Sequence, residues 1–175
     1  EIPIIHREFV DIKPLGEIVD TYYVDGRLVI RGSDFLCVNG TTNIFWANET
    51  IVDVDYADID GDLRSEFAVL TSERLYLIDD DLKAVWSTNY NKTIGYDKIL
   101  VAKLSTPGIL IALWKYNDSH IAYYDVNGVL LNETQLDISA TLLSLTYSVD
   151  YLVGWVWSSD IAVRYDLVAW KYCGS

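Results

Sequence analysis

Short apolar runs separated by polar turn residues make up most of this chain. One stretch shows the pattern clearly, with runs at residues 52–57, 66–70, 74–78 and 83–86 and breaks at 60–62, 71–73 and 79–81. Apolar runs of this length, bounded by Asp, Gly, Ser or Thr, are typical of β-strands. No segment keeps a 3.6-residue apolar period, so the pattern predicts no helix longer than one turn.

The same arrangement recurs with a period of about 40 residues. Residues 35–40 end six positions before Trp46, and residues 75–80 end six positions before Trp86. Residues 159–166 lead again to a tryptophan, Trp170. The pattern predicts four units of four short strands each, at about residues 18–46, 52–86, 99–131 and 141–170.

Four strands per unit at this period are typical of propeller blades, in which the first strand lines the central axis and the fourth lies outermost. We therefore predict an all-β fold over residues 17–175, a four-bladed β-propeller of four-stranded antiparallel blades. The recurring tryptophans are predicted to pack between neighbouring blades. A two-sheet β-sandwich is the alternative, because it also contains many short strands.

Residues 1–16 lie outside the four units and are predicted to form an N-terminal extension strand. Ile2, Ile4, Val10 and Ile12 fall on one face of an extended chain. Two placements are open for this strand: it closes the ring against the last blade, or it pairs with an exposed sheet edge on another subunit. A loose tail is the alternative.

Composition and charge limit the partners. The net charge of -13 disfavours nucleic acid and anionic membrane surfaces, which repel an acidic protein. The chain is 51% hydrophobic, so it is expected to fold, but no apolar run approaches 18 residues and no membrane span is predicted. It begins with Glu1 and contains no Met, which is consistent with removal of a leader.

Asn-x-Ser/Thr sequences are frequent. The chain has eight asparagines, of which roughly one is expected to begin such a sequence by chance, yet five do so. We therefore predict an extracellular or cell-surface protein that carries N-linked glycans. The predicted acceptors are Asn39, Asn48, Asn91, Asn117 and Asn132.

The blade topology also predicts on which face these glycans lie. Asn48, Asn91 and Asn132 are expected after a fourth strand and Asn117 in a turn between strands two and three, which places them on one face. Asn39 is expected on the opposite face, together with an acidic segment at residues 58–66.

That acidic segment carries candidate chemistry. Asp58, Asp60, Asp62 and Glu66 occupy relative positions 1, 3, 5 and 9, and the carbonyl of Arg64 is available at position 7. This spacing lets a tight loop place several oxygens around one hard cation, so these residues are a predicted calcium site. The alternative is a solvated acidic turn.

The segment resembles the FG-GAP repeat of β-propellers of the integrin alpha-chain type and of related bacterial and archaeal surface proteins. The match rests on Asp58, Asp60, Gly61, Asp62 and Glu66, followed by the apolar strand and by the stretch that ends at Trp86. The resemblance implies that the aspartates bind calcium between the first and second strands of a blade.

Two departures from the family pattern stand out. Leu63 occupies a position where the family usually has a glycine in a positive-φ conformation. The acidic loop is also missing from the other three units, where the matching turns are 25–26, 105–108 and 148–150.

The two cysteines, Cys37 and Cys173, are predicted to pair, because an oxidising compartment favours a disulfide in a small domain. In a closed ring the bridge would join the first and last blades, an arrangement similar to the hemopexin-type propeller. Two separate buried thiols are the alternative.

The sequence shows no recognisable arrangement of catalytic residues. The only histidines are His6 and His120, and the sequence contains no nucleophile elbow, zinc-protease motif or phosphate-binding loop. We therefore predict a protein that is not an enzyme: a structural surface or filament subunit, joined into a homopolymer through its N-terminal strand. The alternative is a calcium-dependent module that binds carbohydrate or protein in adhesion.

Overall fold

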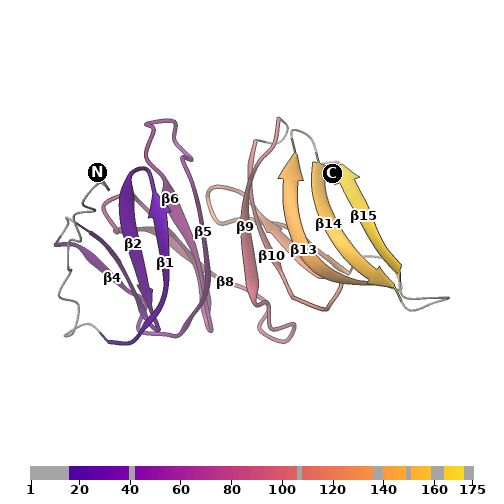
Figure 1. Ribbon diagram of the computed structural model, residues 1–175, viewed down its shortest axis with the longest axis horizontal. Helices are drawn as coiled ribbons and strands as arrows, with labels where there is room; N and C mark the ends of the chain where they lie inside the picture. Colours follow the sequence, from indigo (N-terminus) through magenta and orange to yellow (C-terminus); the bar gives the residue numbers. More distant parts are fainter. Residues whose placement is uncertain are drawn as a thin grey trace, which may run out of the picture.

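The computed structural model describes residues 16–39, 42–105, 108–135, 140–148, 151–158 and 164–171. All regular secondary structure in these residues is β-strand (Figure 1). Within them, no helix is long and apolar enough to cross a membrane. The predicted N-terminal strand with Ile2, Ile4, Val10 and Ile12 lies outside the described residues, as does Cys173.

The strands form four successive antiparallel sheets, which we name blades 1 to 4. Blade 1 contains β1 (Ile18–Val24), β2 (Arg27–Gly32), β3 (Phe35–Val38) and β4 (Ile44–Trp46). Blade 2 contains β5 (Ile51–Ala57), β6 (Glu66–Thr71), β7 (Arg74–Ile78) and β8 (Ala84–Asn89). Blade 3 contains β9 (Lys98–Lys103), β10 (Ile109–Trp114), β11 (His120–Tyr124) and β12 (Leu130–Gln135). Blade 4 contains β13 (Ala140–Ser148), β14 (Tyr151–Ser158) and β15 (Arg164–Lys171).

In every blade, consecutive strands pair side by side. The predicted all-β fold of four antiparallel blades is confirmed, and the sheets are not arranged as the two layers of a sandwich. Blade 4 departs from the prediction because it has three strands in the described residues. Trp170 belongs to its third strand, β15, which pairs with β14 from Tyr151↔Lys171 to Ser158↔Arg164.

The blades form an open row. Blade 1 and blade 4 lie at opposite ends of the long axis, with blades 2 and 3 between them (Figure 1). The first strands of successive blades contact each other, β5 with β9 and β9 with β13. The row therefore follows chain order, and the two end blades do not meet within the described chain.

Apolar side chains fill the spaces between successive blades. Leu36 and Phe45 of blade 1 join Phe67 and Tyr76 of blade 2, and the rings of Phe45 and Tyr76 lie 5.3 Å apart. Two similar clusters join blade 2 to blade 3 and blade 3 to blade 4. Because a single sheet cannot cover its own apolar faces, this burial between blades is the main stabilising contribution to the fold.

Two carboxylates on β5 link the inner strands of blades 2 and 3. Asp53 Oδ2 accepts a hydrogen bond from the N–H of Ile99 at 3.0 Å, and Asp55 Oδ2 accepts one from Val101 at 2.7 Å. Burial raises the pKa of both carboxyl groups above the usual value. The alternating sequence of β5 thus directs two acidic side chains toward β9, a contact that the sequence pattern alone did not indicate.

Cys37 lies in β3 on the face of blade 1 that is turned away from blade 2. It is 7% exposed and packs with Ile30 and Phe35. Burial raises the pKa of its thiol. Cys37 is a free cysteine in this structure. Its predicted partner, Cys173, lies outside the described residues, so the bridge stays a prediction.

Candidate metal centre

The loop between β5 and β6 is folded by its own aspartates. Asp58 Oδ1 accepts a hydrogen bond from Gly61 N at 2.7 Å, and Asp60 Oδ1 accepts one from Asp62 N at 3.1 Å. Asp side chains commonly bond to the backbone two or three residues further on, which stabilises tight turns. The chain reverses here through positive φ angles of 88° at Gly61 and 73° at Leu63.

Three of the predicted ligands converge. Oxygen atoms of Asp58, Asp60 and Glu66 all lie within 4.8 Å of one another. Glu66 is the first residue of β6, is only 7% exposed and pairs with Ala57 across the sheet. The sheet therefore fixes one ligand, and the loop brings the two aspartates to it.

The electrostatics of this group favour a cation. Burial raises the pKa of Glu66; a hydrogen bond from Ile59 N to Oε2, at 2.6 Å, opposes this rise, while the charges of Asp60 and Asp62 add to it. A cation between the carboxylates would offset their mutual repulsion. Clustered carboxylate oxygens are the donor set that Ca²⁺ prefers, so the residues present fit this ion.

Asp62 and Arg64, the other two predicted ligands, make contacts within the loop and beside it. Asp62 is not part of the convergent group, and its Oδ1 accepts a hydrogen bond from Arg64 N at 2.8 Å. The guanidinium of Arg64 points out of the loop to Asp80, with a distance of 2.7 Å between Nη1 and Oδ2. The structure thus brings Asp58, Asp60 and Glu66 together and leaves Asp62 outside that group. The predicted ligand atom of Arg64 is its backbone carbonyl, and that role stays a prediction.

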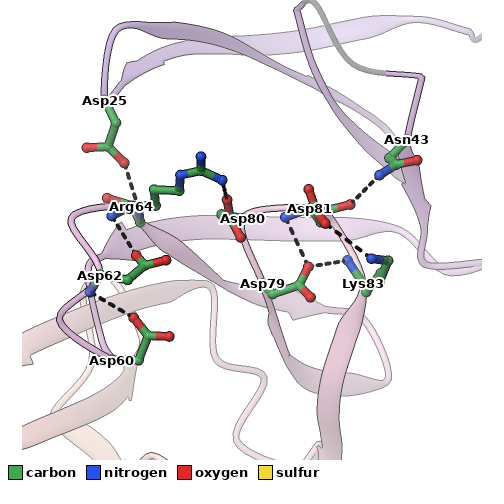
Figure 2. A network of polar contacts seen from close by, with 10 residues as sticks. Asp25, Asn43, Asp60, Asp62, Arg64, Asp79, Asp80, Asp81 and Lys83 are labelled. Atoms are coloured by element: carbon green, nitrogen blue, oxygen red, sulfur yellow. Dashed lines mark hydrogen bonds and ion pairs between the residues drawn. The ribbon is translucent and has the colours of Figure 1, made fainter.

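Neighbouring turns hold the loop in place, as Figure 2 shows. Asp25, in the β1–β2 turn of blade 1, accepts a hydrogen bond from Ser65 N at 2.6 Å. Asp80, in the β7–β8 turn of blade 2, pairs with Arg64 as described. Asn43 of blade 1 donates to the carbonyl of Asp81 at 3.1 Å. These partners were missed from the sequence, because only the packing of blade 1 on blade 2 brings them together.

The predicted glycan acceptors divide between the two ends of the blades. Asn48 and Asn91 lie in links between blades and Asn117 lies in the β10–β11 turn, as expected. Asn39 lies in the β3–β4 turn, at the same end as the acidic loop. Asn132 differs from the prediction, because it lies inside β12, paired with Tyr123, and does not follow that strand. Its side chain is exposed.

Comparisons with known proteins show the fold. No protein-family model matches the chain, and no curated protein matches it. A crystal structure of BBS1N in complex with ARL6DN, soaked with lead, is similar with a TM-score of 0.62 and 16% identity over 90% of this chain and 53% of that chain. The Neurospora crassa Pan2 WD40 domain is similar with a TM-score of 0.56 and 16% identity over 89% of this chain and 50% of that one.

These similarities confirm a propeller-type fold. The chain spans about half the length of the structures that it matches. This agrees with the open row of blades, which corresponds to part of a propeller. At such low identity the likeness concerns the fold alone.

Proposed function

We propose that this protein is an extracellular, N-glycosylated structural protein, a surface or filament subunit whose N-terminal strand joins one copy to the next. The observation that carries the proposal is the open row of blades, in which two end blades lack a neighbouring blade in the described chain (Figure 1). A row with two different ends suits head-to-tail contacts, which generate filaments when the rotation between copies does not close a ring.

Two further features support assembly outside the cell. Five glycan acceptor sequences suit an exported protein, and exposed Asn48, Asn91 and Asn117 are accessible to the modifying enzymes. The acidic net charge keeps copies soluble until specific contacts form.

The test compares the full chain with a variant that lacks residues 1–14. The full chain is expected to sediment as polymers and to form filaments in electron micrographs, whereas the shortened chain stays monomeric. A matched variant, in which Ile2, Ile4, Val10 and Ile12 are all replaced by Ser, keeps the length and is also expected to stay monomeric. Polymers of equal length from all three proteins would contradict the proposal.

The second candidate is a calcium-dependent binding module for carbohydrate or protein. The convergence of Asp58, Asp60 and Glu66 favours it, because a metal-braced loop at one end of the blades offers a rigid contact surface. The similar BBS1N propeller was crystallised in complex with ARL6DN. A binding module would remain monomeric, tolerate loss of residues 1–14 and retain its ligand only when calcium is present.

A further inference from the structure

The turn between β11 and β12 of blade 3 rests against Trp86 of blade 2. The Nε1 of Trp86 donates a hydrogen bond to the carbonyl of Val126, with a distance of 2.7 Å. A Cβ built on Gly128 would lie 2.8 Å from the Trp86 ring, which is closer than a side chain can approach. Gly128 also has a φ of 77°, a conformation that side chains disfavour. Packing and backbone conformation therefore both require glycine at position 128.

This requirement leaves the amide of Asn127 beside an unshielded backbone nitrogen. Asn127 is exposed, and Gly128, which follows it, has no side chain that could block an approach. A backbone nitrogen in this position can attack the Cγ of the preceding asparagine and close a succinimide ring. Bulky residues after an asparagine hinder the attack, whereas glycine does not. Asn127 does not begin an Asn-x-Ser/Thr sequence, so no glycan is expected on its amide.

Asp125 holds this turn closed. Its Oδ1 accepts hydrogen bonds from Asn127 N at 2.9 Å and from Val129 N at 2.8 Å. Its Oδ2 accepts one from the side-chain nitrogen of Asn127 at 3.3 Å, and its carbonyl accepts the N–H of Gly128 at 3.1 Å. The attacking nitrogen is thus engaged in a hydrogen bond, and the nearby carboxylate disfavours the loss of its proton. Asp125 is therefore expected to slow the reaction, although the turn itself is open to water.

We propose that Asn127 is a site of spontaneous deamidation and that Asp125 sets its rate. The deprotonated nitrogen of Gly128 forms a bond to Cγ of Asn127, the bond between Cγ and Nδ2 breaks, and ammonia leaves. The proton lost by the Gly128 nitrogen returns through water to the ammonia. Water then opens the succinimide at either carbonyl and yields aspartate or isoaspartate at position 127. Water is the co-reactant, and no electrons are exchanged. This inference goes beyond the proposed function and does not depend on it.

The two products are expected to affect the blades differently. Aspartate keeps the backbone and adds a negative charge near Asp125. Isoaspartate routes the backbone through the former side chain and so lengthens it by one methylene group. The longer backbone displaces Gly128 from its close approach to Trp86, and close-packed contacts tolerate little displacement. Isoaspartate is therefore expected to loosen the contact between blades 2 and 3 more than aspartate does.

Ageing of the full-length protein tests the proposal. The folded protein is incubated at several pH values, and isoaspartate is followed by enzymatic methylation and by mass spectrometry of the peptide that contains position 127. A synthetic peptide of residues 123–131, incubated in parallel, shows that the conditions suffice for the reaction. Aspartate and isoaspartate are expected at position 127, at a rate that rises with pH. Asn89, which is exposed but followed by Tyr90, is the control within the chain and is expected to stay unmodified.

Variants separate the parts of the proposal. Asn127→Gln is expected not to react measurably, because its longer side chain would have to close a larger ring. Asp125→Ala is expected to react at least several-fold faster than the parent protein. Asp125→Asn keeps a side-chain oxygen as an acceptor but removes the charge, so an intermediate rate is expected. Circular dichroism establishes that each variant is folded before its rate is compared.

Each outcome bears on one part. A reacted peptide beside an unreacted folded protein would overturn the site. Equal rates in the parent protein and in both Asp125 variants would overturn the role of Asp125. Asn127→Asp reproduces the aspartate product and is expected to unfold at nearly the parental temperature, whereas the isoaspartate fraction unfolds at a lower one. Equal unfolding temperatures for all three would overturn the effect on the contact between blades 2 and 3.

Discussion

Two leucines in blade 2 share an unusual backbone conformation but have opposite surroundings. Leu63 has a φ of 73° and is 83% exposed, whereas Leu82 has a φ of 63° and is 5% exposed. Leu82 packs in the cluster between blades 1 and 2, and this burial offsets the unfavourable backbone. The side chain of Leu63 makes no comparable buried contacts that offset its unfavourable backbone conformation. The FG-GAP repeat, which this loop resembles, usually has a glycine at this position.

Replacing Leu63 with Gly is expected to stabilise the protein, because glycine adopts positive φ without steric cost. The expected gain in unfolding free energy is about 1 kcal/mol, measured by urea denaturation in the presence of a chelator. Leu82→Gly is the matched control and is expected to lose about 2–4 kcal/mol, since it removes a buried side chain. A loss in the Leu63 variant would show that the leucine side chain contributes to folding.

Burial of Asp53 and Asp55 makes stability depend on pH in an uncommon direction. A carboxyl whose pKa is raised on folding binds its proton more tightly in the folded state. Its contribution is therefore most favourable at pH values below the ordinary carboxyl pKa and is lost as pH rises through the raised value. Asp118 behaves oppositely: burial acts to raise its pKa, but hydrogen bonds from His120 and Ser119 outweigh this and lower it.

Asp55→Asn is expected to raise the unfolding free energy at pH 7 by on the order of 1 kcal/mol, because the amide oxygen still accepts the Val101 N–H but carries no charge. Urea denaturation from pH 3 to pH 7 measures the effect, and the variant should show a weaker decline in stability toward neutral pH. Asp118→Asn is the contrasting variant and should lose stability at pH 7. Destabilisation by both substitutions would refute the proposed cost of burying Asp55.

At the scale of strands, the 40-residue repeat identifies the strands correctly, but residues 40 positions apart point to opposite faces of equivalent strands. Leu36 and Tyr76 are 40 residues apart, yet both point into the space between blades 1 and 2, from opposite sides. Leu36 and Leu75 are equivalent, since each faces the next blade along the chain. A shift of one residue turns every side chain of a strand to the other face, and a repeat of similar letters does not reveal it.

The tryptophans show the consequence of this shift. Trp86 packs between blades 2 and 3, and its Nε1 donates to the carbonyl of Val126 at 2.7 Å. Trp46 is 44% exposed and packs against Phe35 with the rings tilted by 50°, on the face of blade 1 turned away from blade 2. The predicted packing between blades is therefore confirmed for Trp86, but Trp46 lies elsewhere.

Trp86→Ala is expected to reduce the unfolding free energy by about 3 kcal/mol, since it removes an interface side chain and a hydrogen bond. Trp46→Ala is expected to cost about 1 kcal/mol or less, because much of the ring already contacts water. Thermal and urea unfolding of both variants provides the comparison. Equal losses would contradict the opposite orientations of the two side chains.

The acidic loop gives a prediction for metal binding. Glu66→Gln and Asp60→Ala are expected to weaken calcium affinity at least about tenfold, because each removes a convergent charged oxygen. Asp62→Asn is the control and is expected to change the affinity little, since Asp62 lies outside the convergent group. Calorimetric titration of the metal-stripped protein measures all three, and absence of heat at millimolar calcium in the parent protein would end the idea.

Sequence spacing located this loop well but not its surroundings. The positions of Asp58, Asp60 and Glu66 follow from local chain geometry, which a sequence pattern records directly. Asp25 and Asp80 are distant in sequence from their partners Ser65 and Arg64, and they meet them only because the sheets stack and the turns of strands project from one end. Such contacts depend on how the sheets pack, so a local sequence pattern cannot predict them.

At the scale of the whole molecule, turn positions predict an uneven glycan coat. Asn48, Asn91 and Asn117 lie at the end of the blades opposite the acidic loop, and all three are exposed. Asn39 lies at the end of the acidic loop and is half-buried. Site-by-site glycopeptide mapping is expected to find high occupancy at the first three and lower occupancy at Asn39. Full occupancy of Asn39 with empty sites at the opposite end would contradict this asymmetry.

The sequence predicted the number of blades but not the openness of the row. A 40-residue repeat specifies the strands of each sheet, whereas the angle between sheets depends on the sizes of the side chains packed between them. The same repeat length therefore serves both a small closed ring and a segment of a larger one. The pairing of Cys37 with Cys173 was predicted from the oxidising compartment, and it stays a prediction because Cys173 lies outside the described residues.

In the described chain the strands of each blade contact those of the adjacent blades, and this serial arrangement has a mechanical consequence. Interactions in such an array are sequential, so stability is close to a sum of individual sheets and the interfaces between adjacent ones. Tension applied between the two ends passes through every interface in series, and the weakest interface yields first while the others remain folded. The molecule then lengthens in separate steps, and each step absorbs mechanical work. Between steps, the sheets that remain folded act as templates for those that have opened.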